Sequence, residues 1–84
     1  EPMPQLLRNV RVTGGNAMED AQVKSAIAEG EERLGSGGRL LIRKSGTEPV
    51  VRVMAEGENA GLIDAVVGDI ADAIAQAANL SAGN

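Results

Sequence analysis

The stretch 60–79 constrains the fold most, because its apolar residues form one stripe at helical spacing: Ile63, Val66, Val67, Ile70, Ile74 and Ala77. We predict a helix from about Ala60 to Asn79, with Asn59 as its N-cap residue. A helix with one apolar side needs a second apolar surface to pack against. The chain contains no Phe, Trp or Tyr, so that surface must be aliphatic.

Three stretches of alternating residues predict the strands that supply this surface: 6–12, 39–44 and 50–56. A second apolar stripe predicts another helix, from about Ala17 or Ala21 to Leu34, with Asn16 or Asp20 as N-cap and Gly35 as its stop. The order is therefore strand, helix, strand, strand, helix. It predicts an α+β domain in two layers, a small, mainly antiparallel sheet of about three strands with both helices on one face.

The length of 84 residues fits one domain. Two prolines near the start give residues 1–5 the character of an extended linker from a preceding domain. We predict that the domain itself covers residues 6–80 and that residues 81–84 form a tail.

Composition excludes several classes of function. The chain has no Cys and no His, so disulfide, thiolate and histidine chemistry are excluded, and the lack of Cys fits a reducing compartment. A net charge of −4 and the lack of aromatic residues argue against nucleic acid, and no apolar run approaches the length of a membrane span. The sequence also lacks the cluster of Asp residues that would predict a magnesium site.

Four of the eight cations nevertheless lie between positions 39 and 52, where Glu48 is the only acid: Arg39, Arg43, Lys44 and Arg52. This local excess of positive charge predicts an anion site on an acidic domain.

The connection between the two later strands carries the donors that such a site needs. The Gly46 backbone can approach an anion closely, and the amides around it can form a concave nest. Ser45 and Thr47 add hydroxyls, Arg43 offers a two-pronged guanidinium, and Arg52 can come alongside. Phosphate is the anion that this donor set suits. Two alternatives remain open: the connection is an ordinary turn, or the arginines pair with Glu48 or Glu56.

At this connection the sequence resembles the phosphate-binding loop of the α-D-phosphohexomutase superfamily, in particular of its bacterial members that act on glucosamine phosphates. The resemblance rests on Arg43-Lys44-Ser45-Gly46-Thr47-Glu48-Pro49-Val50-Val51-Arg52-Val53-Met54. Gly38 to Ile42 and the start at Pro4-Gln5 and Asn9-Val10 are similar too.

The resemblance implies the fourth, C-terminal domain of such an enzyme, with a fold like that of TATA-box-binding protein. The parent enzymes are isomerases that interconvert sugar 6-phosphates and 1-phosphates through a bisphosphate. The catalytic phosphoserine, the Mg²⁺-binding loop and the sugar-reading loop belong to the other three domains. Here the resemblance implies no catalytic residue, no cofactor, and a substrate phosphate held by Arg43, Ser45, Gly46, Thr47 and Arg52. Lys44 stands at a position that varies in the family.

The function implied is to clamp the phosphate that is not being transferred, in a cytoplasmic enzyme whose domain four is inert alone. Its partners are the phosphosugar and the other three domains, with no nucleic acid and no membrane. The alternative is a free-standing α+β regulatory or anion-sensing interaction module. That module would prefer another metabolite or dimerise.

Overall fold

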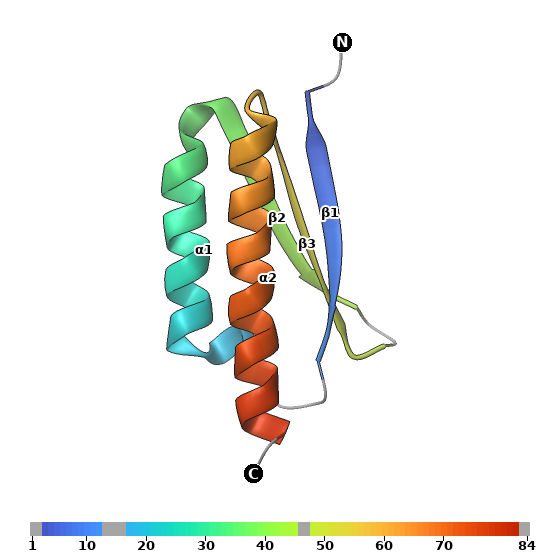
Figure 1. Cartoon of the computed structure of the whole chain (residues 1–84). Coiled ribbons are helices and arrows are strands. Elements are labelled where there is room, and N and C mark those ends of the chain that lie inside the picture. Colours follow the sequence, from blue (N-terminus) through green and yellow to red (C-terminus); the bar gives the residue numbers. More distant parts are fainter. Residues whose placement is uncertain (1–2, 13–16, 46–47, 83–84) are drawn as a thin grey trace.

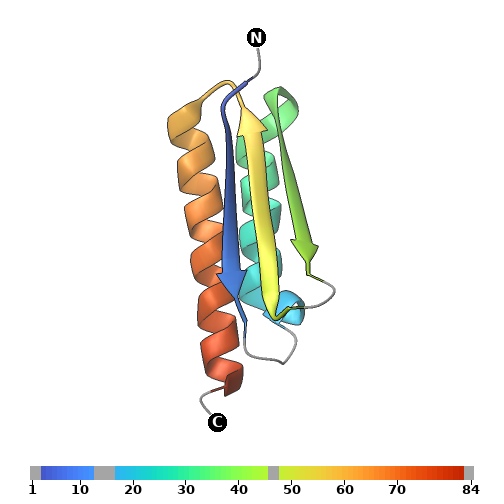
Figure 2. The same ribbon diagram turned by 90° about the vertical axis from the view of Figure 1, so that its right-hand side faces the viewer.

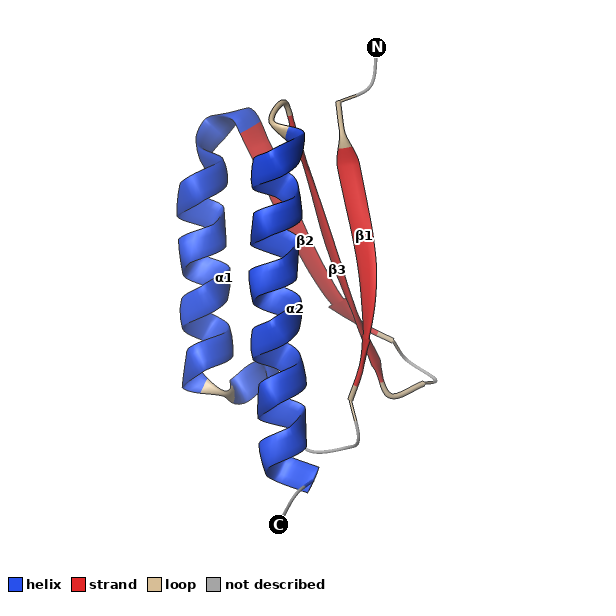
Figure 3. Cartoon of the chain, viewed as in Figure 1, coloured by secondary structure: helices blue, strands red, loops and turns tan. Residues whose placement is uncertain are grey.

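The computed structural model describes residues 3–12, 17–45 and 48–82, with side chains described as far as residue 78. Three antiparallel strands form one layer, and two helices cover one face of the sheet (Figures 1 and 3). The elements are β1 (Gln5–Arg11), a 3-10 helix η1 (Ala17–Glu19), α1 (Ala21–Leu34), a 3-10 helix η2 (Gly35–Gly37), β2 (Gly38–Lys44), β3 (Val50–Gly57) and α2 (Ala60–Ala82). The predicted fold class and element order are confirmed.

The sheet has the order β1-β3-β2, so the last strand in the chain lies between the other two (Figure 2). Both of its neighbours are antiparallel to it. On β3 the residues Val51, Val53 and Ala55 are buried, which identifies the face that the helices cover. Their neighbours Val50, Arg52 and Met54 therefore point to the other face, called the open face below.

The core is aliphatic, as the composition requires, and it includes no buried polar or charged residue among those described. Its largest fully buried side chains come from α1, α2 and the central strand: Ile70, Ile74, Val23, Val51, Val53, Val66 and Val67. The predicted stripe of α2 is thus the part of the helix that packs on the sheet and on α1. In the described part of the chain, neither helix combines the length and apolarity that a membrane span requires.

The ends of α1 show which of the two predicted caps is used. The Asp20 carboxylate accepts hydrogen bonds from the backbone N–H groups of Gln22 at 2.8 Å and Val23 at 3.4 Å, so the helix begins at Ala21. The rival cap, Asn16, lies outside the described residues. Gly35 follows the helix with a positive φ of 61°, as expected for a glycine stop.

Each strand differs from the prediction by one residue at one or both ends, and α2 ends three residues later than predicted. The first strand spans Gln5–Arg11 rather than 6–12, and Gln5 pairs with Glu56 near the end of β3. The carbonyl of Pro4 also accepts a hydrogen bond from the Gly57 N–H, at 3.1 Å, so Pro4 and Gln5 are fastened to the sheet. The second helix continues to Ala82 rather than ending at Asn79, and no Gly or Pro interrupts the sequence between Gly68 and Gly83.

Replacing Gly68 by alanine should stabilise the protein by about 0.5–1 kcal/mol. Glycine inside a helix costs roughly this much relative to alanine, and a β-carbon at Gly68 would meet no atom within 4 Å. Urea unfolding followed by circular dichroism measures the change. The comparison variant is Gly35→Ala, which should destabilise by about 1 kcal/mol because its φ of 61° is strained for alanine. If the Gly68→Ala protein unfolded at a lower urea concentration than the unsubstituted protein, the space for a methyl group at position 68 would be refuted.

Candidate phosphate site

A five-residue connection, residues 45–49, joins β2 to β3 at the end of the sheet where β1 also ends (Figures 1 and 2). Its base is closed by the Ser45 N–H, which donates to the Val50 carbonyl at 2.8 Å. The Ser45 hydroxyl accepts a hydrogen bond from the Glu48 N–H at 3.2 Å, and the Val12 N–H donates to the Pro49 carbonyl at 2.7 Å. The connection is therefore fastened to β3 and, through Val12, to the chain that leaves β1.

Ser45 has a structural part in this connection that the sequence did not indicate. Its hydroxyl oxygen, acting as an acceptor, shapes the turn in the way that Ser side chains often do. A hydroxyl also carries a donor hydrogen, so the two roles are chemically compatible. Gly46 and Thr47, which we predicted to supply the close backbone approach and a second hydroxyl, lie outside the described residues.

Arg43 and Arg52 lie directly opposite each other on β2 and β3. Both are exposed, and both are on the open face, since Arg52 alternates with the buried Val51 and Val53. Side chains at directly opposed positions have β-carbons about 4.5–5.5 Å apart. The structure thus places the two predicted arginines on neighbouring strands and on the same face, close to Ser45.

No acidic oxygen of the described residues lies within 4.0 Å of either arginine. The ion pairs formed among those residues are elsewhere: Lys24–Glu19 at 3.5 Å, Arg33–Asp69 at 3.0 Å and Arg39–Glu56 at 3.6 Å. Glu56, one of the alternative partners, is thus paired with Arg39, and Glu48 pairs with neither Arg43 nor Arg52. Like charges on directly opposed residues destabilise a sheet, so an anion between these two arginines would relieve a repulsion.

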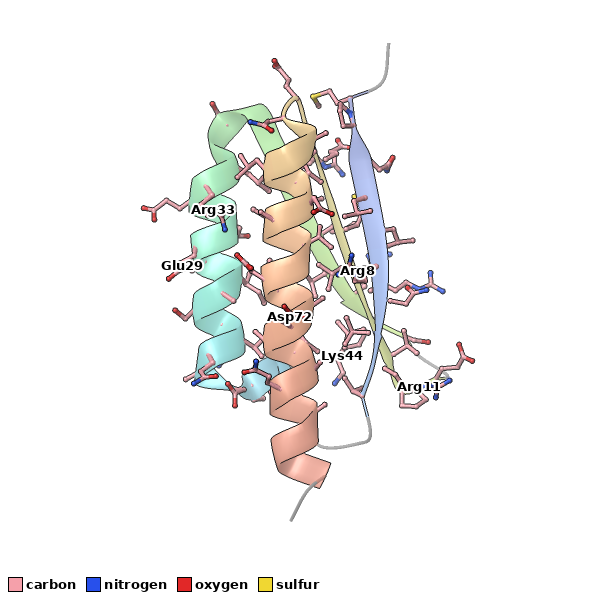
Figure 4. All side chains as sticks on the ribbon, in the orientation of Figure 1. Arg8, Arg11, Glu29, Arg33, Lys44 and Asp72 are labelled. Atoms are coloured by element: carbon pink, nitrogen blue, oxygen red, sulfur yellow. The ribbon has the colours of Figure 1, made fainter. Side chains whose placement is uncertain are left out.

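Lys44 does not belong to this pair. It is opposite the buried Val51, which places it on the face that carries the helices, and Figure 4 shows Lys44 on that side. Its separation from Arg43 and Arg52 agrees with leaving it out of the predicted site.

A shallow hollow of about 440 Å³ extends from the two arginines along the open face. Its lining includes an apolar row that crosses all three strands, in which Leu7 and Leu41 both lie opposite Met54. Leu7 is 55% exposed and Leu41 is 37% exposed, so this row is open in the isolated chain. The hollow therefore joins a cationic end to an apolar floor.

The strand order brings two further residues beside the arginine pair. Asn9 lies directly opposite Arg52, and Arg11 lies opposite Val50, so both share the open face with the arginine pair. Alternation along 6–12 already placed Asn9 and Arg11 on one side of their strand. What the sequence lacked was the identity of the neighbouring strand.

No group of three or more Asp, Glu, His or Cys side chains is placed to hold a metal ion within residues 3–12, 17–45 and 48–78. The arginines gathered at this end of the sheet carry fixed positive charge and donor groups only, so they bind anions rather than cations.

Comparison with known proteins connects these features to a family. Residues 7–73 match the family described as phosphoglucomutase/phosphomannomutase, C-terminal domain. A phosphoglucosamine mutase of Brucella ovis is 57% identical over 82 residues, 98% of this chain and 18% of that protein. Another phosphoglucosamine mutase, from Rhizobium rhizogenes, is 56% identical over 79 residues, 94% of this chain and 18% of that protein. The chain thus spans under a fifth of the length of these relatives.

Solved structures of the same kind share the fold. A variant of the Aspergillus fumigatus N-acetylphosphoglucosamine mutase, in complex with glucose 1,6-bisphosphate, has a TM-score of 0.73 and 26% identity over 90% of this chain and 16% of that one. The structure of that fungal enzyme with GlcNAc-6P and magnesium has a TM-score of 0.67, 27% identity and the same coverage. With the family match covering most of the chain, this protein belongs to the phosphoglucomutase/phosphomannomutase family, as a C-terminal domain of it.

Proposed function

We propose that the chain is the phosphate-binding C-terminal domain of a phosphoglucosamine mutase, and that Arg43, Arg52 and the 45–49 connection clamp the phosphate that is not being transferred. The observation that carries the proposal is the opposition of Arg43 and Arg52 on the open face, with no acid of the described residues within 4.0 Å. Two guanidinium groups in this position can hold several oxygens of one dianion.

The parent enzyme would convert glucosamine 6-phosphate to glucosamine 1-phosphate through a bisphosphate, in the cytoplasm. The names of the relatives support this choice of sugar, and the fungal neighbour was solved with a sugar bisphosphate and, separately, with a sugar phosphate and magnesium. The phosphoserine and the Mg²⁺ would be supplied by the rest of the parent protein. This domain supplies no proton transfer and no nucleophile, so its contribution is to orient the bisphosphate.

A clamp that reads the phosphate rather than the sugar suits this reaction, because the bisphosphate must present each of its two ends in turn. The arginine pair provides such a clamp, since guanidinium groups match phosphate geometry whatever the ester carries. The remaining length of the 440 Å³ hollow gives the attached sugar room over the apolar row.

The test is a titration of the 84-residue chain with inorganic phosphate and with glucosamine 6-phosphate, followed by amide and phosphorus NMR. Each charge-assisted hydrogen bond contributes roughly 1.5–3 kcal/mol, so three or four should give millimolar affinity or better after the cost of association. Shifts should concentrate in residues 43–52, and the two ligands should bind with similar affinity. Resonances of that segment that stay unchanged at high millimolar phosphate would refute the proposal, as would mutase turnover by the chain alone.

The same titration at lower pH provides a control on the charge of the ligand. A phosphate monoester loses its second negative charge below a pKa of about 6. The chain has no His, which is the side chain that ordinarily changes its charge between pH 7.5 and 5.5. Affinity should therefore fall severalfold over this range, whereas a sulfate ester, which keeps its charge, should bind equally at both pH values.

A further inference from the structure

The third strand, β1, lies directly beside the arginine pair, because the sheet has the order β1-β3-β2. The antiparallel register places Asn9 opposite Arg52, and Arg52 opposite Arg43, so these three residues form one row across β1, β3 and β2. All three are exposed and on the open face. The Asn9 side chain can donate from its amide nitrogen to the same anion that the two guanidinium groups bind.

Arg11 stands in the next row of the open face, opposite Val50, which is the first residue after the 45–49 connection. It is diagonal to Arg52, a separation of about 7–8 Å that a long side chain spans easily. The following residue, Val12, donates its N–H to the Pro49 carbonyl at 2.7 Å, so Arg11 is held next to the connection. Figure 4 shows Arg11 on the side of the sheet away from the helices.

The charge of Arg11 is also uncompensated in the described part of the chain. No acidic oxygen there lies within 4.0 Å of it, whereas Arg33 and Arg39 each have an acidic partner. Arg11, Arg43 and Arg52 therefore form a group of three arginines around one end of the sheet, drawn from three different strands. A group of like charges without an acidic partner favours a multivalent anion over a singly charged one.

We propose that Asn9 and Arg11 complete the anion site, so that the phosphate is held from β1 as well as by Arg43 of β2 and Arg52 of β3. The third guanidinium makes the site selective for a phosphate monoester dianion over a carboxylate. This inference rests on the proposed function, because it adds residues to the same site. What it adds is that β1 contributes side chains that bind the phosphate, although the sequence alone did not place β1 beside Arg52.

The test compares Arg11→Ala with Arg8→Ala in the phosphate titration at fixed ionic strength. Arg8 is a matched control, since it is an exposed arginine on the same strand, and its partner Val53 is buried, so it is on the helix side. Figure 4 shows the two side chains on opposite sides of the sheet. Arg11→Ala should weaken phosphate binding about tenfold, and Arg8→Ala by less than twofold. Arg11→Lys should recover part of the loss, because it restores the charge without the planar fork.

A second pair of variants tests Asn9. Asn9→Ala should weaken binding a few fold, whereas Asn9→Asp should abolish it, because a carboxylate would then lie opposite Arg52 and repel the phosphate. Urea midpoints should stay unchanged in the alanine variants, since both side chains are exposed.

The outcomes separate this inference from the proposed function. If the unsubstituted 84-residue chain binds no phosphate, the proposed function fails and this inference fails with it. Suppose instead that the unsubstituted chain binds phosphate and that Arg43→Ala loses this affinity. If Arg11→Ala and Asn9→Ala then bind phosphate normally, only the inference about β1 is overturned. Equal losses in Arg11→Ala and Arg8→Ala would also overturn it, because they would show an effect of net charge rather than of position.

Discussion

Replacing Arg43 by alanine should weaken the binding of phosphate to this chain by roughly ten- to a hundredfold, the largest loss expected of any alanine substitution in the site. A hydrogen bond between charged partners contributes about 1.5–3 kcal/mol, and each 1.4 kcal/mol corresponds to a factor of ten. Arg43 is the last arginine before the connection, faces Arg52 and has no acidic partner among the described residues, so its guanidinium is available to the ligand. The phosphate titration followed by amide NMR measures the loss.

The matched control is Arg39→Ala. Arg39 is on the same strand and the same face, but at the other end of the sheet, where it pairs with Glu56 at 3.6 Å. The Arg39→Ala substitution should leave phosphate affinity within about twofold of that of the unsubstituted chain. The exposed ion pair that it removes contributes at most about 1 kcal/mol to stability. Arg43→Lys should fall between the parent and Arg43→Ala, because a lysine keeps the charge but cannot form the bidentate contact. An Arg43→Ala protein that unfolds would mean that the residue is structural; equal losses at positions 39 and 43 would reduce the site to a general electrostatic attraction.

The sequence predicted the elements well because the two periodicities differ clearly. Stripes of Val, Ile and Ala at helical spacing gave both helices, and alternation gave all three strands to within one residue at each end. The uncertain points were the ends. Spacing alone could not decide whether Asp20 or Asn16 is the N-cap residue of α1, since both precede its apolar stripe. The structure shows that the Asp20 carboxylate accepts hydrogen bonds from the first turn of the helix.

The site was predictable only in its local part. A hairpin pairs residues that are close in sequence, so the short connection already indicated that Arg43 and Arg52 lie near each other. The contribution of β1 was not accessible in this way. Alternation fixes which face a residue occupies but not which strand lies beside it, and Asn9 is separated from Arg52 by more than forty positions. The order β1-β3-β2 is a property of the whole domain, because it depends on the path of the chain between strands that are not consecutive.

Replacing Ile70 by alanine should destabilise the domain by about 2–5 kcal/mol. Ile70 is fully buried at the contact between the two helices, where its Cδ1 atom would lie only 3.1 Å from a β-carbon placed on Gly30. The helices approach so closely there that little surrounding structure can collapse into the space left by the isoleucine. A domain of 84 residues has a total stability of about 4–13 kcal/mol, so the loss is a large share of it.

Urea unfolding of Ile70→Ala beside Ile70→Val, which should cost only about 0.5–1.5 kcal/mol, measures this effect. Gly30→Ala alone should also destabilise, because its β-carbon would lie 3.0 Å from Val66 Cγ1 and 3.1 Å from Ile70 Cδ1. Combined with Ile70→Ala it should cost less, because the second of these contacts is then removed. Phosphate affinity of the folded fraction should not change in any of these variants, since Ile70 and Gly30 lie on the side of the sheet opposite the arginines.

A core substitution that lowers stability alone and an Arg43 substitution that lowers affinity alone would together establish that the aliphatic layer holds the strands in register while the open face binds the anion. If Ile70→Ala also weakened the affinity of the folded molecules, the arginine row would depend on the helix contact, and the site could not be treated as a rigid surface.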